Sequence, residues 1–167
     1  LLTYLYNILM KDKLHNCIKN KNTDYIPIWF MRQAGRYLPE FREIRNKNPN
    51  FINLCLNTKL ITDITLQPLN RFDLDAAIIF SDILMIPYGL GQNVEFKKGF
   101  GPILENINFK EIINKHPKDF TEKLLPVYKG IEEVKKKTTE KSLIGFVGAP
   151  WTILLYMLNK KSPKKNF

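Results

Sequence analysis

The arginines of this chain are concentrated in one short stretch. Lysine and arginine together number 26, but only five of these residues are arginine, and four of the five lie between positions 27 and 45. A guanidinium group can hold a carboxylate or a phosphate through two parallel hydrogen bonds, which an ammonium group cannot do. The stretch therefore predicts a site that binds an anion. The five arginines are Arg32, Arg36, Arg42, Arg45 and Arg71.

The segment before the first of these arginines is apolar. Ile26–Met31 reads Ile-Pro-Ile-Trp-Phe-Met, which is typical of a buried strand. Gly35 then permits a turn between Arg32 and Arg36. We expect an anion-binding loop at the end of a core strand.

A second candidate group is a carboxylate. Ala76–Phe80 is a continuous apolar run that predicts a parallel strand buried on both faces, and Asp82 follows it after a single serine. A carboxylate at this place is partly dehydrated and needs hydrogen-bond donors. The alternative is that Asp82 caps the next helix, because aspartate is a favoured N-cap residue.

A third candidate lies beyond the next apolar strand, Leu143–Val147. A Gly-Ala-Pro turn leads from it into a predicted helix, Pro150–Leu158, which carries Tyr156 among apolar residues. The alternative for Tyr156 is an ordinary core tyrosine. Each of the three candidate groups follows the carboxyl end of a strand, and this is the face on which barrel enzymes build their active sites.

Helices and strands alternate along the chain. Helical spacing of apolar residues predicts an amphipathic helix within residues 1–19 and further helices near 51–56, 58–72 and 124–137. Leu38-Pro39-Glu40 predicts the start of another helix, because proline and glutamate both favour a first turn, and Val94–Phe96 predicts a short hairpin strand. This order is typical of an α/β fold with a parallel sheet. Alternation alone leaves a doubly wound sheet and a (β/α)8 barrel both open.

The composition is that of one globular domain. The 167 residues are 44% hydrophobic and 25% charged, with a formal charge of +10. A basic chain can bind nucleic acid or a membrane surface, but no RGG tract, KH-type loop or zinc knuckle accompanies the charge. We expect the lysines to occupy solvated faces, with no nucleic-acid or membrane partner. Leu1–Met10 is apolar but too short to cross a bilayer.

The sequence predicts neither a metal site nor a bound cofactor. Cys17 and Cys55 lie 38 positions apart without a CxxC pair, so no disulfide framework is expected. His15 and His116 lie outside the motifs described above and are predicted to be surface residues. The chain has no HExxH, Walker loop or complete GxGxxG motif.

Three blocks of the sequence resemble a known family. They are PIWFMRQAGRYLPEF (27–41), LQPLNRFDLDAAIIFSDIL (66–84) and IGFVGAPWTILLYM (144–157), and they are similar, in this order, to the signature blocks of uroporphyrinogen decarboxylase, a haem-pathway enzyme. The resemblance covers about 24–157 and implies a (β/α)8 TIM-type barrel, of which this chain is the N-terminal part, with about three core parallel strands and flanking helices. Because the family is about twice as long and the sequence begins without methionine, we expect residues 1–167 to be one incomplete domain.

The resemblance also implies a reaction and a site. The family removes the four acetate carboxylates of uroporphyrinogen III, giving coproporphyrinogen III and CO2 without a cofactor. The aspartate that matches Asp82 binds the pyrrole N–H groups, the arginine that matches Arg32 binds a substrate carboxylate and has been proposed as the proton donor, and the tyrosine that matches Tyr156 lies near both. The implied catalytic residues are Asp82, Arg32 and Tyr156. The implied substrate contacts are Arg32, Gln33, Ala34, Gly35, Arg36, Arg45, Ile78, Phe80, Asp82 and Tyr156, with Met31 as a further apolar wall.

Other interpretations of these residues stay open. Arg32 and Arg36 can instead be salt-bridged structural residues, and Arg42 and Arg45 alternate with glutamates in a pattern typical of a solvated helix face. A serine and a histidine from later strands of the family have no counterpart here, so we expect that the 167 residues alone cannot catalyse the reaction. Methyltransferases that share the fold carry zinc-ligating residues that this sequence lacks.

The resemblance further implies a homodimer for the full-length protein. We expect a cytoplasmic location, or a plastid one if a targeting peptide precedes the sequence. The alternative functions are a non-catalytic relic and a basic nucleic-acid-binding fragment.

Overall fold

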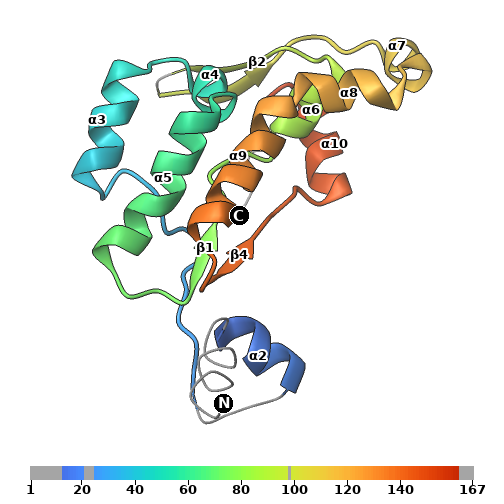
Figure 1. Ribbon diagram of the computed structural model, residues 1–167. Coiled ribbons are helices and arrows are strands. Elements are labelled where there is room, and N and C mark those ends of the chain that lie inside the picture. The colour runs from blue at the N-terminus through green and yellow to red at the C-terminus, as the bar shows by residue number, and fades with distance from the viewer. Residues whose placement is uncertain (1–12, 21–24, 98, 162–167) are drawn as a thin grey trace, which may run out of the picture.

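The computed structural model describes residues 13–20, 25–97 and 99–161 (Figure 1). Most of the predicted amphipathic helix within residues 1–19 therefore lies outside the described residues, and its last part, residues 13–19, is helical. The helices of the described part are α2 (Lys13–Asn20), α3 (Pro39–Lys47), α4 (Phe51–Cys55), α5 (Thr58–Arg71), α6 (Met85–Leu90), α7 (Phe109–Asn114), α8 (Pro117–Lys123), α9 (Leu125–Lys137) and α10 (Pro150–Asn159). The strands are β1 (Ala76–Ile78), β2 (Val94–Lys97), β3 (Gly101–Leu104) and β4 (Ser142–Ile144).

Local sequence signals explain where several helices begin. Pro39 opens α3 at its first turn, where a missing N–H costs nothing. The side chains of Asn50 and Asn57 accept hydrogen bonds from backbone N–H groups in the first turns of α4 and α5. The lysines of residues 135–137 lie in the last turn of α9, where the helix dipole favours cations. The predicted helix start at 38–40 and the predicted helices at 51–56, 58–72, 124–137 and 150–158 are confirmed.

The central feature is a parallel pair of strands. β1 pairs with β4 in register, Ala76 beside Ser142 and Ile78 beside Ile144. The connection between them contains a hairpin and four helices, as a parallel pairing requires a long crossover. The predicted α/β class with parallel strands is confirmed, and the arrangement is that of part of a barrel.

Two helices cover one face of this pair. α5 packs against α9, and Ile61 of α5 forms a buried cluster with Ile79 and Val134. The helices approach closely at Gly130, where an added Cβ would lie 2.7 Å from the Ile61 side chain. In Figure 1, the lower end of α9 reaches β1 and β4, and Leu143 packs against the cluster that Val134 of α9 belongs to.

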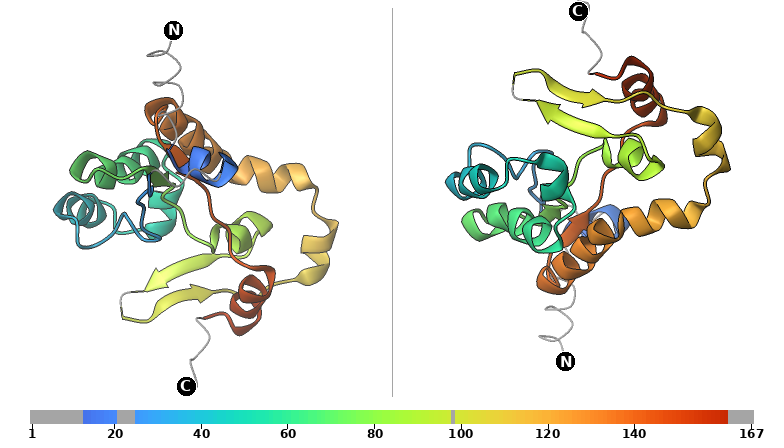
Figure 2. Two further views of the ribbon diagram at one scale, coloured as in Figure 1. Left: turned by 90° about the horizontal axis from the view of Figure 1, so that it is seen from below. Right: turned by 90° about the horizontal axis from the view of Figure 1, so that it is seen from above.

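The hairpin is attached to the last helix. β2 and β3 pair antiparallel, as the sequence predicts for this region, and Leu104 N–H donates to the carbonyl of Lys160 at 2.8 Å. The buried Gln92 amide donates to the carbonyl of Met157 at 3.1 Å. Both views of Figure 2 accordingly show the hairpin beside α10.

The prediction that Ile26–Met31 is a buried strand is wrong. These residues are extended but form no strand, and Ile26 and Met31 are each 80% exposed. The segment meets β1 through Ile28, whose carbonyl accepts a hydrogen bond from Asp75 N–H at 2.9 Å. One such bond does not make a ladder, so the apolar side chains are left uncovered on the side away from β1. The strand predicted at Leu143–Val147 is also shorter, and Phe146 and Val147 are exposed.

Asp75 joins this extended segment to the sheet. Its side chain is buried, and Oδ2 accepts hydrogen bonds from the Tyr25 hydroxyl at 2.7 Å and from Ile28 N–H at 2.8 Å. Oδ1 lies 3.4 Å from the Lys13 ammonium of α2. Burial raises the pKa of the Asp75 carboxyl, but the hydrogen bonds and the Lys13 charge more than offset this and hold the pKa below its usual value.

The remaining sequence predictions concern cysteines, histidines and membranes. Cys17 and Cys55 are free thiols, and His15 and His116 are exposed, as predicted. His116 also caps α8, since its Nδ1 accepts a hydrogen bond from Lys118 N–H. In the part of the chain that the structure describes, no helix is both long enough and apolar enough to cross a membrane.

Candidate active site

The backbone beyond β1 is held on both sides. Ile79 N–H donates to the carbonyl of Ile144 at 3.0 Å, which extends the contact with β4. Phe80 N–H donates to the hydroxyl of Thr65 at 2.8 Å, which fixes the chain to α5. Asp82 follows two residues later, so the backbone directly before it is fixed by these hydrogen bonds.

The Asp82 carboxylate is half-buried. Its Oδ1 accepts a hydrogen bond from Leu84 N–H at 2.8 Å, just before α6 begins. Burial raises the pKa of the Asp82 carboxyl above its usual value, and the hydrogen bond from Leu84 opposes that shift. The carboxylate also raises the pKa of the Cys55 thiol, second to the burial of that thiol. Asp82 is partly dehydrated, as the first interpretation predicts. The alternative interpretation, that Asp82 caps the next helix, is wrong: the N-cap position of α6 is Leu84, which has no side-chain cap hydrogen bond, and the Asp82 oxygen serves the turn before the helix.

Arg32 lies in a turn between the extended segment and α3, with its side chain exposed. The next residue, Gln33, is only 3% exposed. Its side-chain amide accepts a hydrogen bond from Phe30 N–H and donates one to the carbonyl of Ala76 in β1. The turn that carries Arg32 is therefore tied to the strand that leads to Asp82.

One cavity of about 780 Å³ gathers the candidate groups from three parts of the fold. Arg32 comes from the turn, Asp82 from the segment after β1, and Tyr156 from α10. Ile78 and Ile144, which are register partners, both line it, while Leu143 packs toward α9. Since side chains alternate across a strand, the cavity lies mainly on the face of β1 and β4 opposite α9. Its volume is in the usual range for a small-molecule site. The other predicted residues that line it are Met31, Gln33, Ala34 and Phe80.

Three of the residues predicted to contact substrate are not among the described residues that line this cavity. They are Gly35, Arg36 and Arg45. Arg36 is exposed, and its carbonyl accepts a hydrogen bond from the Arg42 guanidinium at 2.7 Å. The Arg45 guanidinium donates to the carbonyl of Asn48, the residue that follows the last turn of α3. The ion pair found among the arginines of the described residues belongs to Arg71, with Glu40 at 2.9 Å, so the salt-bridge interpretation is not supported for Arg32 or Arg36.

Several lining residues were missed by sequence reasoning. Phe96 and Pro102 reach the cavity from the hairpin, and Trp29 and Phe146 reach it from exposed segments. The hairpin itself was predictable, but nothing local indicates that it folds over the end of β1. The aromatic character of Trp29 was a usable signal, because it directly precedes the arginine turn.

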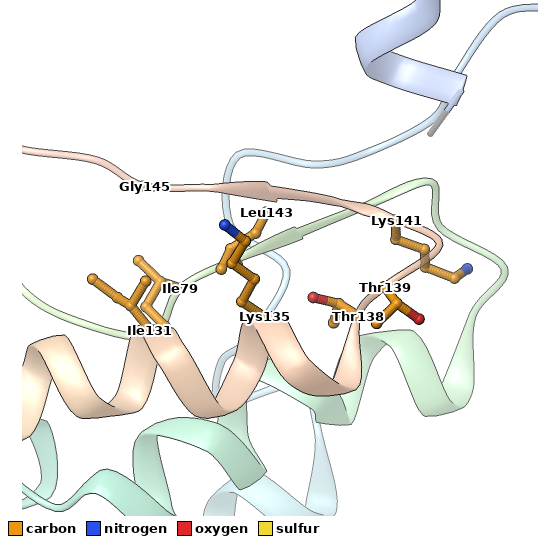
Figure 3. A pocket seen from close by; sticks show the side chains of 8 residues that line it. All are labelled: Ile79, Ile131, Lys135, Thr138, Thr139, Lys141, Leu143 and Gly145. Carbon is orange, nitrogen blue, oxygen red and sulfur yellow. The ribbon is translucent and has the colours of Figure 1, made fainter. Parts of the chain in front are cut away.

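A second cavity, of about 550 Å³, lies between α9 and β4 (Figure 3). Its polar groups serve the fold: the Thr138 hydroxyl donates to the carbonyl of Val134, and the Lys141 ammonium donates to the carbonyl of Leu74. No carboxylate is among the described residues that line it. The candidate chemistry therefore belongs to the first cavity. Within the described ranges, no group of three or more His, Cys, Asp or Glu residues is arranged to hold a metal ion.

Comparison with known proteins identifies relatives over most of the chain. Residues 9–166 match the family described as uroporphyrinogen decarboxylase (URO-D). The chain is 50% identical over 147 residues to the uroporphyrinogen decarboxylase of Rickettsia canadensis, covering 87% of this chain and 43% of that protein. It is 46% identical over 151 residues to the one from a Chelativorans species, covering 90% of this chain and 44% of that protein.

A solved structure shows the same fold at low identity. A methyltransferase from Methanosarcina mazei aligns with a TM-score of 0.64 and 14% identity, over 85% of this chain and 43% of that one. The chain spans less than half the length of the curated relatives that it matches. The family match nonetheless covers nearly every residue described above, and the chain belongs to the uroporphyrinogen decarboxylase family.

Proposed function

We propose that this chain forms the part of an active site that binds uroporphyrinogen III, for decarboxylation to coproporphyrinogen III. One observation carries the proposal: a single cavity brings together a guanidinium, a partly dehydrated carboxylate and a tyrosine, between apolar walls. A tetrapyrrole with eight carboxylates complements this set, because its rim is anionic and its inner face offers four N–H donors. Membership of the family supports the same substrate.

In the proposed reaction the substrate supplies the electron sink. A proton adds to a pyrrole α-carbon and makes the ring cationic. The bond between the acetate methylene and its carboxylate then breaks, CO2 leaves, and the electron pair neutralises the ring. Protonation of the exocyclic carbon and loss of the α-proton leave a methyl group. Asp82 accepts hydrogen bonds from the pyrrole N–H groups and stabilises the cation, and Arg32 holds a substrate carboxylate.

The raised pKa of Asp82 fits this role. Asp82 is a half-buried carboxylate that lines the cavity and accepts a hydrogen bond from Leu84 N–H at one oxygen, so it can accept further donors. Pyrrole N–H groups would donate hydrogen bonds to the Asp82 carboxylate, and a cationic ring would balance its charge. The carboxylate therefore interacts most strongly with the substrate at the stage when the ring is charged. Tyr156 lines the same cavity from α10 and is proposed to orient the substrate beside Asp82.

Binding and turnover can be tested separately. We expect the purified chain to bind uroporphyrin, the oxidised octacarboxylate analogue, more tightly than coproporphyrin, which has four carboxylates. Quenching of tryptophan fluorescence reports binding, because Trp29 lines the cavity. Arg32→Ala and Asp82→Asn should weaken it, whereas the control Arg71→Ala, on a guanidinium paired outside the cavity, should not. Equal affinity for both porphyrins would count against the proposal. So would a loss of affinity in Arg71→Ala as large as that in Arg32→Ala and Asp82→Asn.

Turnover is expected to require more than these residues. We expect no coproporphyrinogen when the chain alone is incubated anaerobically with uroporphyrinogen III and the products are oxidised and separated by chromatography. Activity near that of a complete family member would refute this expectation. Binding to DNA or RNA with a steep salt dependence, and none to uroporphyrin, would instead support the nucleic-acid alternative. The homodimer stays a prediction for the full-length protein.

A further inference from the structure

Gln33 is one of the most deeply buried polar residues beside the cavity, with 3% of its surface exposed. Its Oε1 accepts a hydrogen bond from Phe30 N–H at 2.9 Å, three residues earlier in the chain. Its Nε2 donates to the carbonyl of Ala76 at 3.0 Å, across 43 residues of sequence. One side chain thus closes the turn around Arg32 and joins that turn to the start of β1.

An amide suits this position better than other groups. Phe30 offers an N–H and needs an acceptor, whereas Ala76 offers a carbonyl and needs a donor, so the two ends of the amide have different partners. Glutamate would place an acceptor-only group against the carbonyl of Ala76, and an apolar residue would leave both backbone groups without a partner.

The turn is fastened on its other side as well. The backbone carbonyl of Gln33 accepts a hydrogen bond from the Tyr37 hydroxyl, and Leu38 N–H donates to the carbonyl of Gly35 at 3.0 Å. Together with the bond from Phe30 N–H to the Gln33 side chain, these bonds hold the backbone before and after Arg32, while its guanidinium remains exposed. An arginine on a fixed backbone loses less conformational freedom when it binds an anion than one on a loose loop.

We propose that Gln33 is a positioning residue for Arg32: its buried amide fixes the turn so that the guanidinium faces the cavity that contains Asp82. The inference rests on the proposed function of that cavity. It replaces the expectation that Gln33 binds substrate directly, because both ends of the amide already bond to the backbone.

A double-mutant cycle separates positioning from direct contact. Gln33→Met keeps the length of the side chain and removes both hydrogen bonds. We expect it to weaken uroporphyrin binding about tenfold when Arg32 is present, which corresponds to about 1.4 kcal/mol. In an Arg32→Ala background the same change should weaken uroporphyrin binding less than about twofold, because the guanidinium that Gln33 positions is already absent.

The hydrogen bond itself can be observed without any ligand. Gln33→Met should speed hydrogen exchange at the Phe30 amide, while far-UV circular dichroism shows that the helices are retained. If this variant does not fold, Tyr37→Phe replaces it: this change removes only the hydroxyl that donates to the carbonyl of Gln33, and it should weaken binding about threefold, again only when Arg32 is present.

Two results would overturn the inference. The first is an equal loss of affinity with and without Arg32, which would indicate that Gln33 contacts the ligand. The second is unchanged exchange at the Phe30 amide. If the unsubstituted chain binds no uroporphyrin, the proposed function fails, and exchange at that amide then decides by itself whether Gln33 fixes the turn.

Discussion

Replacing Asp75 with alanine should be one of the most damaging single changes to the stability of this chain. The carboxylate is 6% exposed, and one of its oxygens accepts two hydrogen bonds, from the Tyr25 hydroxyl and from Ile28 N–H. A hydrogen bond to a charged group contributes roughly 1.5 kcal/mol or more. The Lys13 ammonium is 3.4 Å away but partly exposed, so the ion pair adds little. Together these terms predict a loss of about 3 kcal/mol for Asp75→Ala.

Urea unfolding, followed by circular dichroism, measures this loss. Tyr25→Phe removes one of the two hydrogen bonds and should cost about 1.5 kcal/mol. Asp73→Ala is the matched control, because Asp73 is 97% exposed and its ion pair with Lys141 is long, at 3.5 Å. The control should change stability by no more than about 0.5 kcal/mol.

The effect should also depend on pH in one direction. The folded protein holds the pKa of Asp75 below the value of an unfolded aspartate, which is about 4. Its contribution is therefore complete above that value and is lost as the pH falls through the lower folded pKa. The gap in stability between the parent and Asp75→Ala should shrink in acid. A gap that is constant with pH, or no larger than that of Asp73→Ala, would refute the reasoning.

Three other changes test other parts of the structure. Asp82→Asn should raise the melting temperature at pH 7, because burial raises the pKa of that carboxyl and its charge increasingly destabilises the folded state as the pH rises above about 4. A difference in melting temperature between variant and parent that is the same at pH 4 and at pH 7 would contradict this. Iodoacetamide should alkylate Cys17 readily but Cys55 only after unfolding, since Cys55 is fully buried and its pKa is raised; mass spectrometry of the labelled chain measures both rates. Gly130→Ala should cost about 1–3 kcal/mol in urea unfolding by forcing two helices apart, whereas Gly145→Ala, with open space around it, should stay within about 0.5 kcal/mol.

The elements that the sequence predicted well are those defined by local signals. The helices α3, α4, α5, α9 and α10 have caps, prolines or apolar spacing that act within a few residues. The abrupt end of the apolar run before Asp82 indicated the strand and the position of the carboxylate. Tyr156 was identified on the helix that follows the turn after the next strand, and both residues line one cavity with Arg32.

The errors arose where the outcome depends on distant parts of the chain. The apolar residues of Ile26–Met31 carry the same signal whether or not neighbouring strands cover them, and here they meet β1 at little more than Ile28. The Arg45 side chain is oriented by its hydrogen bond to the carbonyl of Asn48, which the spacing of arginines in the sequence does not indicate. Phe96 reaches the cavity because a hairpin folds across it, and no local pattern encodes that contact.

The short strand β1 has an aspartate near each end, and the two have opposite effects on the protein. Asp75, directly before the strand, has a lowered pKa and fastens neighbouring segments, whereas Asp82, beyond its other end, has a raised pKa and faces the cavity. The contacts that stabilise the fold and the carboxylate that lines the cavity thus lie at opposite ends of one segment. Contacts around Asp75 can therefore be strengthened to compensate for the cost of a charge at Asp82, without altering the groups that line the cavity.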